Sequence, residues 1–398
     1  MKRRDFFKSA GLTAVAGLGF PGESVSRAQS ASIKKYGVLG GTGLKIGDIS
    51  FGCGDLSSPS LVARAVDMGV NYFDTAPDYG PSEMTLGKFI KQSPGMRGKM
   101  HIASKFCAKG GYPSHLRAND PQSEYISVVE GSLKRMNTDY LDVVFVHAMG
   151  EKSRGYEERL FSENMLNAFE KLKKAGKARF LAVSSHGPNR MEELMMKAVK
   201  SGHYDIIQPA HNFMKFPNTP EVIKEAGKRN VGVIAMKTLA GAKEMGLDPK
   251  GEPFAHAAFK WVLKNPNIAG LIVTISNARD LAHYVEASGQ PYNKKSQRTL
   301  DRYKLAYSEE YCRTGCGECL SACPDNVNVA SVLRQEMYFS DYHQEKRAME
   351  SYCAMAPNAS NCSACAGAVG APCEAACPYG LPIRKLMEKA NELLSFQT

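Results

Sequence analysis

The segment LDVVFVH at residues 141–147 is followed by ENMLNAFEKLKKA at residues 163–175 and by RFLAVSS at residues 179–185. The first and third pieces are short, nearly continuous apolar runs, which are typical of strands buried on both faces. The middle piece repeats its apolar side chains at helical spacing and ends in basic residues followed by Gly176, a common way for a helix to stop. These residues therefore predict a strand–helix–strand unit.

The same alternation continues through much of the chain. The predicted strands are residues 49–54, 72–76, 100–106, 141–147, 179–185, 206–210, 232–237 and 270–275, and helices are predicted at residues 121–136, 163–175, 191–201 and 254–264. Eight such units in about 250 residues predict an α/β fold, a (β/α)8 TIM barrel. A doubly wound open sheet is the alternative. The predicted barrel covers residues 33–290, a connector follows at 291–304, and a smaller domain occupies 305–398.

Composition narrows the class of protein. The chain has 398 residues and a mean hydropathy of −0.31, which excludes collagen-like and disordered classes. No apolar run reaches 18 residues, so no membrane span is expected in the mature chain. The net charge of +11 is not accompanied by a basic and aromatic patch, so no nucleic-acid partner is expected.

Residues 1–28 have the composition of an export signal. Three basic residues near the start precede a short apolar stretch and the small-residue site Ser26-Arg27-Ala28, a pattern of processed segments. The run RRDFFK at residues 3–8 resembles the twin-arginine signal. That route exports folded proteins, so a periplasmic location is expected. The alternative is a frayed basic terminus.

Four polar residues lie at the predicted carboxyl ends of strands, where TIM barrels place their active sites. They are Asp74, Tyr79, Lys105 and His147. A tyrosine phenol titrates near pH ~10, so it needs a nearby cation to exchange protons at neutral pH. Lys105 would supply that cation, Asp74 would hold Lys105, and His147 would donate a hydrogen bond to a substrate carbonyl oxygen. Each of the four could instead be structural.

Several stretches resemble the aldo-keto reductase family over roughly residues 36–290. They are LGGTGL at 39–44, FDTAPDYG at 73–80, ASK at 103–105 and SLKRMNTDYLD at 132–142, which leads to His147. The resemblance implies NADP- or NAD-dependent hydride transfer to a small carbonyl, or from a small alcohol, with Tyr79 as the proton donor. It also implies cofactor-binding roles for Ser184, Ser185, Gln208, Met236, Ser276 and Arg279. Cys53 ends the first predicted strand, and this position by itself would allow it to contact the cofactor.

Two of these positions depart from the family pattern. Ser185 stands where the family has an Asn that holds the carboxamide, and Met236 stands where many members stack an aromatic ring. Asp280 aligns with the family's arginine for the 2′-phosphate, although Arg279 is adjacent. An acidic residue repels a phosphate, so the alignment leaves NADP and NAD both open.

Eight cysteines form a second candidate site. One group is Cys312, Cys316, Cys319 and Cys323, and the other is Cys362, Cys365, Cys373 and Cys377; each group ends in Cys-x₃-Cys-Pro. The pattern resembles a bacterial ferredoxin with two 4Fe-4S clusters, in which the last cysteine of each group ligates the other cluster. Zinc sites and disulfides are the alternatives. Cys53, Cys107 and Cys353 remain, and we expect them to be buried small hydrophobic residues.

The sequence therefore predicts an exported iron–sulfur oxidoreductase with a reductase barrel and a ferredoxin-like electron-transfer domain. Nicotinamide exchanges two electrons and each cluster one, so coupling them normally needs a flavin. A flavin is compatible with the scheme, but no flavin site is visible in the sequence. A redox partner protein is also compatible with it. The alternative is a non-catalytic electron-transfer or docking subunit that uses the barrel as a scaffold.

Overall fold

The computed structural model describes residues 31–396, except for 111–113, 150–156, 187–189, 215, 217, 241–250, 308–311, 313–316, 341–343 and 368–370. The predicted export signal lies outside the described residues. Residues 31–398 form one compact unit.

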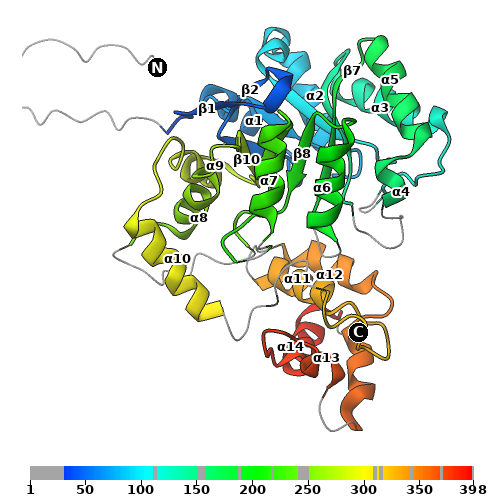
Figure 1. The fold of residues 1–398 in the computed structure, drawn as a ribbon, viewed down its shortest axis with the longest axis vertical. Helices are drawn as coiled ribbons and strands as arrows, with labels where there is room; N and C mark the ends of the chain where they lie inside the picture. The colour runs from blue at the N-terminus through cyan, green and yellow to red at the C-terminus, as the bar shows by residue number, and fades with distance from the viewer. Residues whose placement is uncertain are drawn as a thin grey trace, which may run out of the picture. The chain divides into compact units, whose positions relative to one another are not determined.

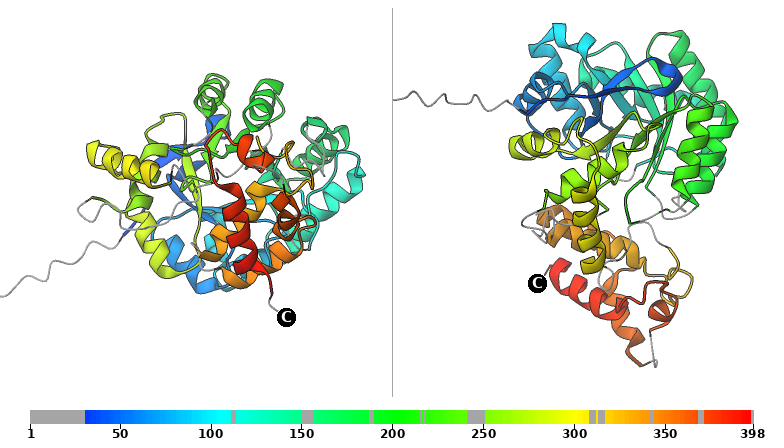
Figure 2. Two further views of the ribbon diagram at one scale, coloured as in Figure 1. Left: turned by 90° about the horizontal axis from the view of Figure 1, so that it is seen from below. Right: turned by 60° about the vertical axis from the view of Figure 1, so that its left-hand side comes forward.

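Eight parallel strands close into a barrel (Figures 1 and 2). In barrel order they are β10 (Gly270–Thr274), β3 (Ile49–Gly52), β4 (Tyr72–Asp74), β5 (His101–Lys105), β6 (Leu141–Val146), β7 (Ala178–Ser185), β8 (Ile206–Pro209) and β9 (Gly232–Ala235). This closed, all-parallel order confirms the predicted barrel and excludes the open sheet. Each observed strand starts within one residue of the start of its predicted run. Each also ends one or two residues before the predicted end, except β7, which ends at the predicted residue.

Helices surround the strands, as Figure 2 shows from below. They are α1 (Pro59–Asp67), α2 (Ser82–Gln92), α3 (Gln122–Met136), α4 (Glu157–Leu160), α5 (Glu163–Lys174), α6 (Met191–Ser201), α7 (Thr219–Lys228), α8 (Phe254–Leu263) and α9 (Ala278–Val285), with 3₁₀ turns at Gly40–Thr42 and Pro94–Lys99. Local residues set several of their ends. Ser162 caps α5 by accepting from the N–H of Met165 at 3.2 Å, and Asn137 ends α3 with φ of 51°, as caps commonly do.

An antiparallel hairpin of β1 (Tyr36–Val38) and β2 (Lys45–Gly47) precedes the barrel. Its buried residues Leu39, Leu44 and Ile46 join Tyr72 and Ile206 in the barrel interior. Because the last two residues begin their strands, the hairpin fills the amino-terminal end of the barrel. That end is closed, and the opposite end is left for chemistry.

Residues 291–304, which the sequence assigns to a connector, belong largely to helix α10 (Lys294–Tyr307). Leu300 and Tyr303 are buried, and the Tyr303 ring stacks on Phe254 of α8 with centroids 4.1 Å apart. Leu300 and Tyr303 of α10 therefore pack on the barrel's outer layer of helices, whereas Leu305 is exposed.

The remaining described elements form a separate helical core. They are α11 (Val329–Ser340), α12 (Glu345–Cys353), a 3₁₀ segment (Ala359–Gly367), α13 (Pro372–Ala375) and α14 (Ile383–Leu394). Val332, Tyr352, Ile383 and Met387 are buried together there, with Cys319 among them. All regular elements in the described part of residues 305–396 are helical.

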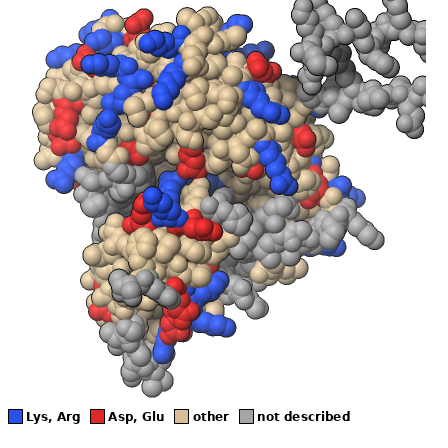
Figure 3. Space-filling model, turned by 180° about the vertical axis from the view of Figure 1, so that it is seen from behind, with Lys and Arg blue, Asp and Glu red and all other residues tan. Residues whose placement is uncertain are grey.

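Two surface properties complete the description. No helix among the described residues has both the length and the apolar character needed to cross a membrane. On the face seen in Figure 3, Lys and Arg side chains are interspersed with Asp and Glu.

Candidate active site

Three neighbouring strands deliver the four predicted catalytic residues to one end of the barrel. Asp74 ends β4, Lys105 ends β5, and His147 directly follows β6. Tyr79 lies in the turn after β4, where its N–H donates to Ala76 O at 3.1 Å. Parallel strands place their carboxyl ends on the same rim, so the barrel brings these side chains together.

Lys105 and Asp74 form a buried ion pair. Their side chains are 1% and 2% exposed, and the Lys105 ammonium donates to Asp74 Oδ1 and, at 2.9 Å, to Thr75 O. Gln208 donates from Nε2 to Asp74 Oδ2 at 3.0 Å. The Asp74 carboxylate is thereby satisfied on both oxygens, and the Lys105 ammonium group is held in place in a buried site.

Tyr79 and His147 face each other beside this cation. The Tyr79 hydroxyl lies 3.3 Å from His147 Nε2, and Lys105 Nζ lies 5.1 Å from the Tyr79 ring centroid. A fixed positive charge next to a phenol stabilises the phenolate, which is what a proton-transferring tyrosine requires.

His147 is held as a neutral imidazole. Burial lowers its pKa well below the usual range, and the charges of His115 and Lys105 lower it further. Nδ1 of His147 lies 3.3 Å from Cys107 Sγ. A neutral ring with Nδ1 engaged in this way can carry its proton on Nε2, where it is able to donate to a substrate oxygen.

The predicted cofactor residues also lie on this end of the barrel. Ser184 and Ser185 end β7, Gln208 lies on β8, Met236 follows β9, and Cys53 follows β3; all are buried. The Ser184 hydroxyl accepts from Ala148 N at 3.1 Å, and the Ser185 hydroxyl donates to Met149 O at 2.8 Å. Both hydroxyls therefore hold the backbone that follows His147.

The other two predicted cofactor residues, Ser276 and Arg279, follow β10 and are exposed. Ser276 donates to Asp55 Oδ2 at 3.3 Å. The N–H groups of Arg279 and Asp280 donate to Asn277 Oδ1, each at 2.9 Å. Asn277 therefore caps α9. Its side chain engages two of the backbone N–H donors at the start of this helix that could otherwise bind a phosphate.

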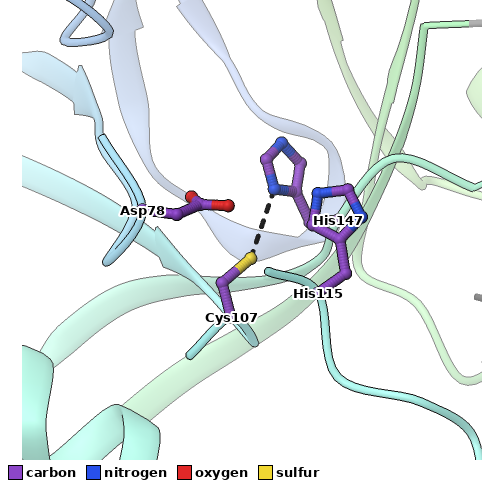
Figure 4. Close-up of side chains that lie close together, drawn as sticks. All are labelled: Asp78, Cys107, His115 and His147. Carbon is purple, nitrogen blue, oxygen red and sulfur yellow. Dashed lines mark hydrogen bonds between the residues drawn. The ribbon is translucent and has the colours of Figure 1, made fainter. Parts of the chain in front are cut away.

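Sequence reasoning missed several residues of this rim. Cys107 and Cys53 are buried as expected, but Cys353 is exposed, because it lies at the end of a surface helix. Cys107, His115 and Asp78 lie against His147 (Figure 4). Only the positions of Asp78 and Cys107, a few residues past predicted strands, were available as signals.

Tyr338 of α11, Arg347 of α12 and Gln344, which directly precedes α12, contact residues that follow barrel strands. Lys237, next to Met236, donates to the Tyr338 hydroxyl at 3.3 Å. Arg347 pairs with Asp55 at 2.5 Å, and Gln344 donates to the same carboxylate. Burial by itself would raise the pKa of Tyr338, but the charge of Lys237 and of nearby arginines lowers it to about 8.

The cysteines gather in the C-terminal core. A narrow hollow is lined by Cys323, Cys362, Cys365 and Cys373, so the last cysteine of the first group joins three of the second. Burial raises the pKa of Cys362 to about 11, and the charges of Cys323 and the two other cysteines act in the same direction. Cys312, Cys319 and Cys377 contribute to the same core, and Cys316 lies outside the described residues.

The closed parallel barrel carries the side chains of Asp74, Tyr79, Lys105 and His147 on its carboxyl rim. Residues 55–243 match the aldo/keto reductase family, and this part of the chain is an aldo/keto reductase domain. The protein is an oxidoreductase of the aldo-keto reductase type.

Known proteins resemble the barrel part of the chain. L-glyceraldehyde 3-phosphate reductase of Escherichia coli K12 is 22% identical over 330 residues, which cover 68% of this chain and 92% of that protein. L-galactose dehydrogenase of Arabidopsis thaliana is 29% identical over 235 residues, or 55% and 69% of the two chains. A solved putative aldo-keto reductase from Pseudomonas aeruginosa has a TM-score of 0.53 at 27% identity, and the match covers 68% of this chain and 98% of that one.

Proposed function

We propose that the protein interconverts a small carbonyl compound and its alcohol with NADP(H) or NAD(H), and that its C-terminal domain holds two 4Fe-4S clusters for electron transfer. The observation that carries the first part is the buried Lys105–Asp74 pair beside the facing Tyr79 and His147. A scaffold would not need to bury an ion pair next to a tyrosine hydroxyl, because burying charges costs free energy.

The residues divide the chemistry between them. Bound nicotinamide supplies the hydride for reduction, or accepts it in the reverse direction. His147 Nε2–H would orient the substrate carbonyl oxygen, and Tyr79 would deliver the proton that this oxygen needs as the carbonyl carbon gains hydride. Lys105 stabilises the phenolate that remains, and Asp74 with Gln208 keeps Lys105 in place.

The site residues fit a nicotinamide in part. Gln208, which donates to Asp74, and Met236, which directly follows β9, are both buried at this end of the barrel, and an amide and a soft thioether suit a planar ring. Ser184 and Ser185 use their hydroxyls on the backbone at residues 148 and 149. Carboxamide recognition in this chain would therefore depend on groups other than a Ser–Asn pair.

The cysteines fit the proposed clusters. Four thiols from two distant groups line one hollow, and four cysteine sulfurs are the usual ligands of a 4Fe-4S cluster. Cys312, Cys316, Cys319 and Cys377 would hold the other cluster. Each cluster would accept one electron at a time, so the domain suits exchange with a redox partner protein.

The test is an anaerobic titration of the purified protein with NADPH and then NADH, followed by visible absorption. Bleaching of the cluster band by either nucleotide would link the two parts and call for analysis of bound flavin. Bleaching by dithionite alone would mean that nicotinamide does not reduce the clusters, and that they exchange electrons with another partner.

Tyr79→Phe separates catalysis from the scaffold alternative. Loss of the proton donor should lower kcat for carbonyl reduction by about 10²- to 10⁴-fold, with little change in nucleotide affinity. Unchanged turnover in the variant would overturn the catalytic role of Tyr79, whereas a wild-type protein that reduces no carbonyl compound would favour the docking subunit.

We also propose periplasmic export by the twin-arginine route, based on residues 1–28. Cell fractionation should find the mature chain in the periplasm. Arg3→Lys combined with Arg4→Lys should retain the full-length chain in the cytoplasm.

A further inference from the structure

Four buried side chains with metal-binding atoms converge beside the active site (Figure 4). They are Asp78, Cys107, His115 and His147, and one carboxylate oxygen, one sulfur and two ring nitrogens all lie within 4.8 Å of one another. Only His147 has a role in the proposed reaction, so the other three need a separate explanation.

The donors come from three strand ends and from one loop that folds back over them. Asp78, Cys107 and His147 follow the neighbouring strands β4, β5 and β6. His115 comes from the loop after β5, which folds back so that Cys107 and His115 form an antiparallel bridge. Hydrogen bonds on both sides of the bridge fix it, from Ala108 N to Ser114 O at 2.8 Å and from Leu116 N to Phe106 O at 3.2 Å.

The cluster also contains an uncompensated acceptor. Asp78 is 4% exposed. Its Oδ2 accepts from Ser114 N at 3.2 Å, but its buried Oδ1 has no hydrogen-bond partner among the described residues. A buried carboxylate oxygen in this state costs free energy, and a cation bound among the four donors would offset that cost.

The two ring nitrogens of His147 divide naturally between the two sites. Nδ1 faces Cys107 Sγ at 3.3 Å, whereas Nε2 faces the Tyr79 hydroxyl. The backbone around the site is held by Arg159, which donates to His147 O at 2.7 Å and to Leu116 O at 3.1 Å. A ligand on Nδ1 would leave Nε2 protonated and aimed at the reaction site.

We propose that Asp78, Cys107, His115 and His147 bind a divalent zinc ion. One thiolate, two imidazoles and one carboxylate are all ligands that zinc takes in fourfold sites. Zinc–sulfur and zinc–nitrogen bonds of about 2.3 and 2.0 Å place neighbouring donors roughly 3.3–3.5 Å apart. Donors as far apart as the 4.8 Å limit must therefore approach by about 1.3–1.5 Å. The proposal does not rest on the proposed reductase activity.

The primary test is zinc analysis of the whole protein, purified and equilibrated with a small excess of zinc. Elemental analysis should find about one zinc per chain after removal of loosely bound metal. X-ray absorption at the zinc edge, which is separate from iron, should show one sulfur at about 2.3 Å and nitrogen or oxygen neighbours at about 2.0–2.1 Å. A shell of four sulfurs would place the zinc in the cysteine groups instead, and absence of bound zinc would equally overturn the proposal.

Variants assign the ligands. Cys107→Ala and His115→Ala should each lower zinc binding at least tenfold. Cys353→Ala and His203→Ala are the matched controls, because both residues are exposed and distant in sequence from the four donors, and they should retain the metal. Full zinc occupancy in well-folded Cys107→Ala and His115→Ala would refute the assignment. If these variants fail to fold, the absorption spectrum of the wild-type protein still decides between the outcomes.

Discussion

Replacing Lys105 by Met should destabilise the barrel, because it breaks the buried ion pair with Asp74. The change leaves Asp74, whose side chain is 2% exposed, without its cation and leaves Thr75 O without a donor. Removing one partner of a buried pair costs about 3–5 kcal/mol. Gln208 still donates to Asp74 Oδ2, so we expect the lower end, about 3 kcal/mol.

The double variant Asp74→Asn/Lys105→Met removes the stranded charge together with its partner. It should recover about 2 kcal/mol of the loss, because the penalty of the single variant is mainly an uncompensated carboxylate. Lys177→Met is the control: Lys177 pairs with Glu130 at 2.5 Å, with side chains 38% and 48% exposed. That variant should lose less than about 1 kcal/mol.

Urea unfolding followed by tryptophan fluorescence measures this loss in the barrel. The chain has one tryptophan, Trp261 on α8, so the signal reports the barrel and not the cysteine-bearing domain. A single-variant loss below about 1 kcal/mol, or a double variant no more stable than Lys105→Met, would refute the reasoning.

Three further predictions follow from other contacts. Asp142 accepts from Arg97 and Arg179 at 3.0 and 2.9 Å. Burial opposes ionisation of Asp142, but its hydrogen bond with His101, the charge of Arg97 and the N–H of Ile102 together lower its pKa. A carboxylate whose pKa is lowered on folding stabilises the fold above its unfolded pKa, and this stabilisation is lost as the pH falls through the folded pKa. The stability deficit of Asp142→Asn in urea unfolding should therefore shrink below about pH 4, and a deficit constant from pH 7 to 3 would contradict this. Tyr338 should give a phenolate absorbance step with a midpoint of about 8 that is missing in Tyr338→Phe and moves to higher pH in Lys237→Met; an unshifted midpoint in the latter would exclude the contact. Cys373→Ala should lower bound iron from about eight to about four atoms per chain, whereas unchanged iron would remove Cys373 from the ligands.

Much of the barrel could be predicted from the sequence because its signals are local. A strand buried on both faces must be apolar throughout, and a surrounding helix must repeat its apolar residues every three to four positions. The observed α6 has the predicted bounds, and α3, α5 and α8 differ from theirs by one residue at one end. The sequence did not predict that the connector at residues 291–304 packs on the barrel. The few apolar residues that pack α10, such as Leu300, are outnumbered by polar ones.

The candidate site was predicted only as far as strand ends could be located. Asp74, Lys105 and His147 follow from that rule and from the family resemblance. Gln208 was assigned to the nicotinamide, but in the structure its amide also supports Asp74. Cys107 was interpreted as a small hydrophobic residue, because a single cysteine carries no information about its neighbours.

The sequence by itself determined the order of strands and helices, the residue types available at each strand end and the two cysteine groups. These properties depend on residues close together in the chain. Tertiary structure decided which side chains meet: His115 with His147, Arg347 with Asp55, and Cys323 with Cys362. The pairs are separated by 32 to 292 residues, so the contacts exist only once the strands close into a barrel and the helices pack, which no local pattern records.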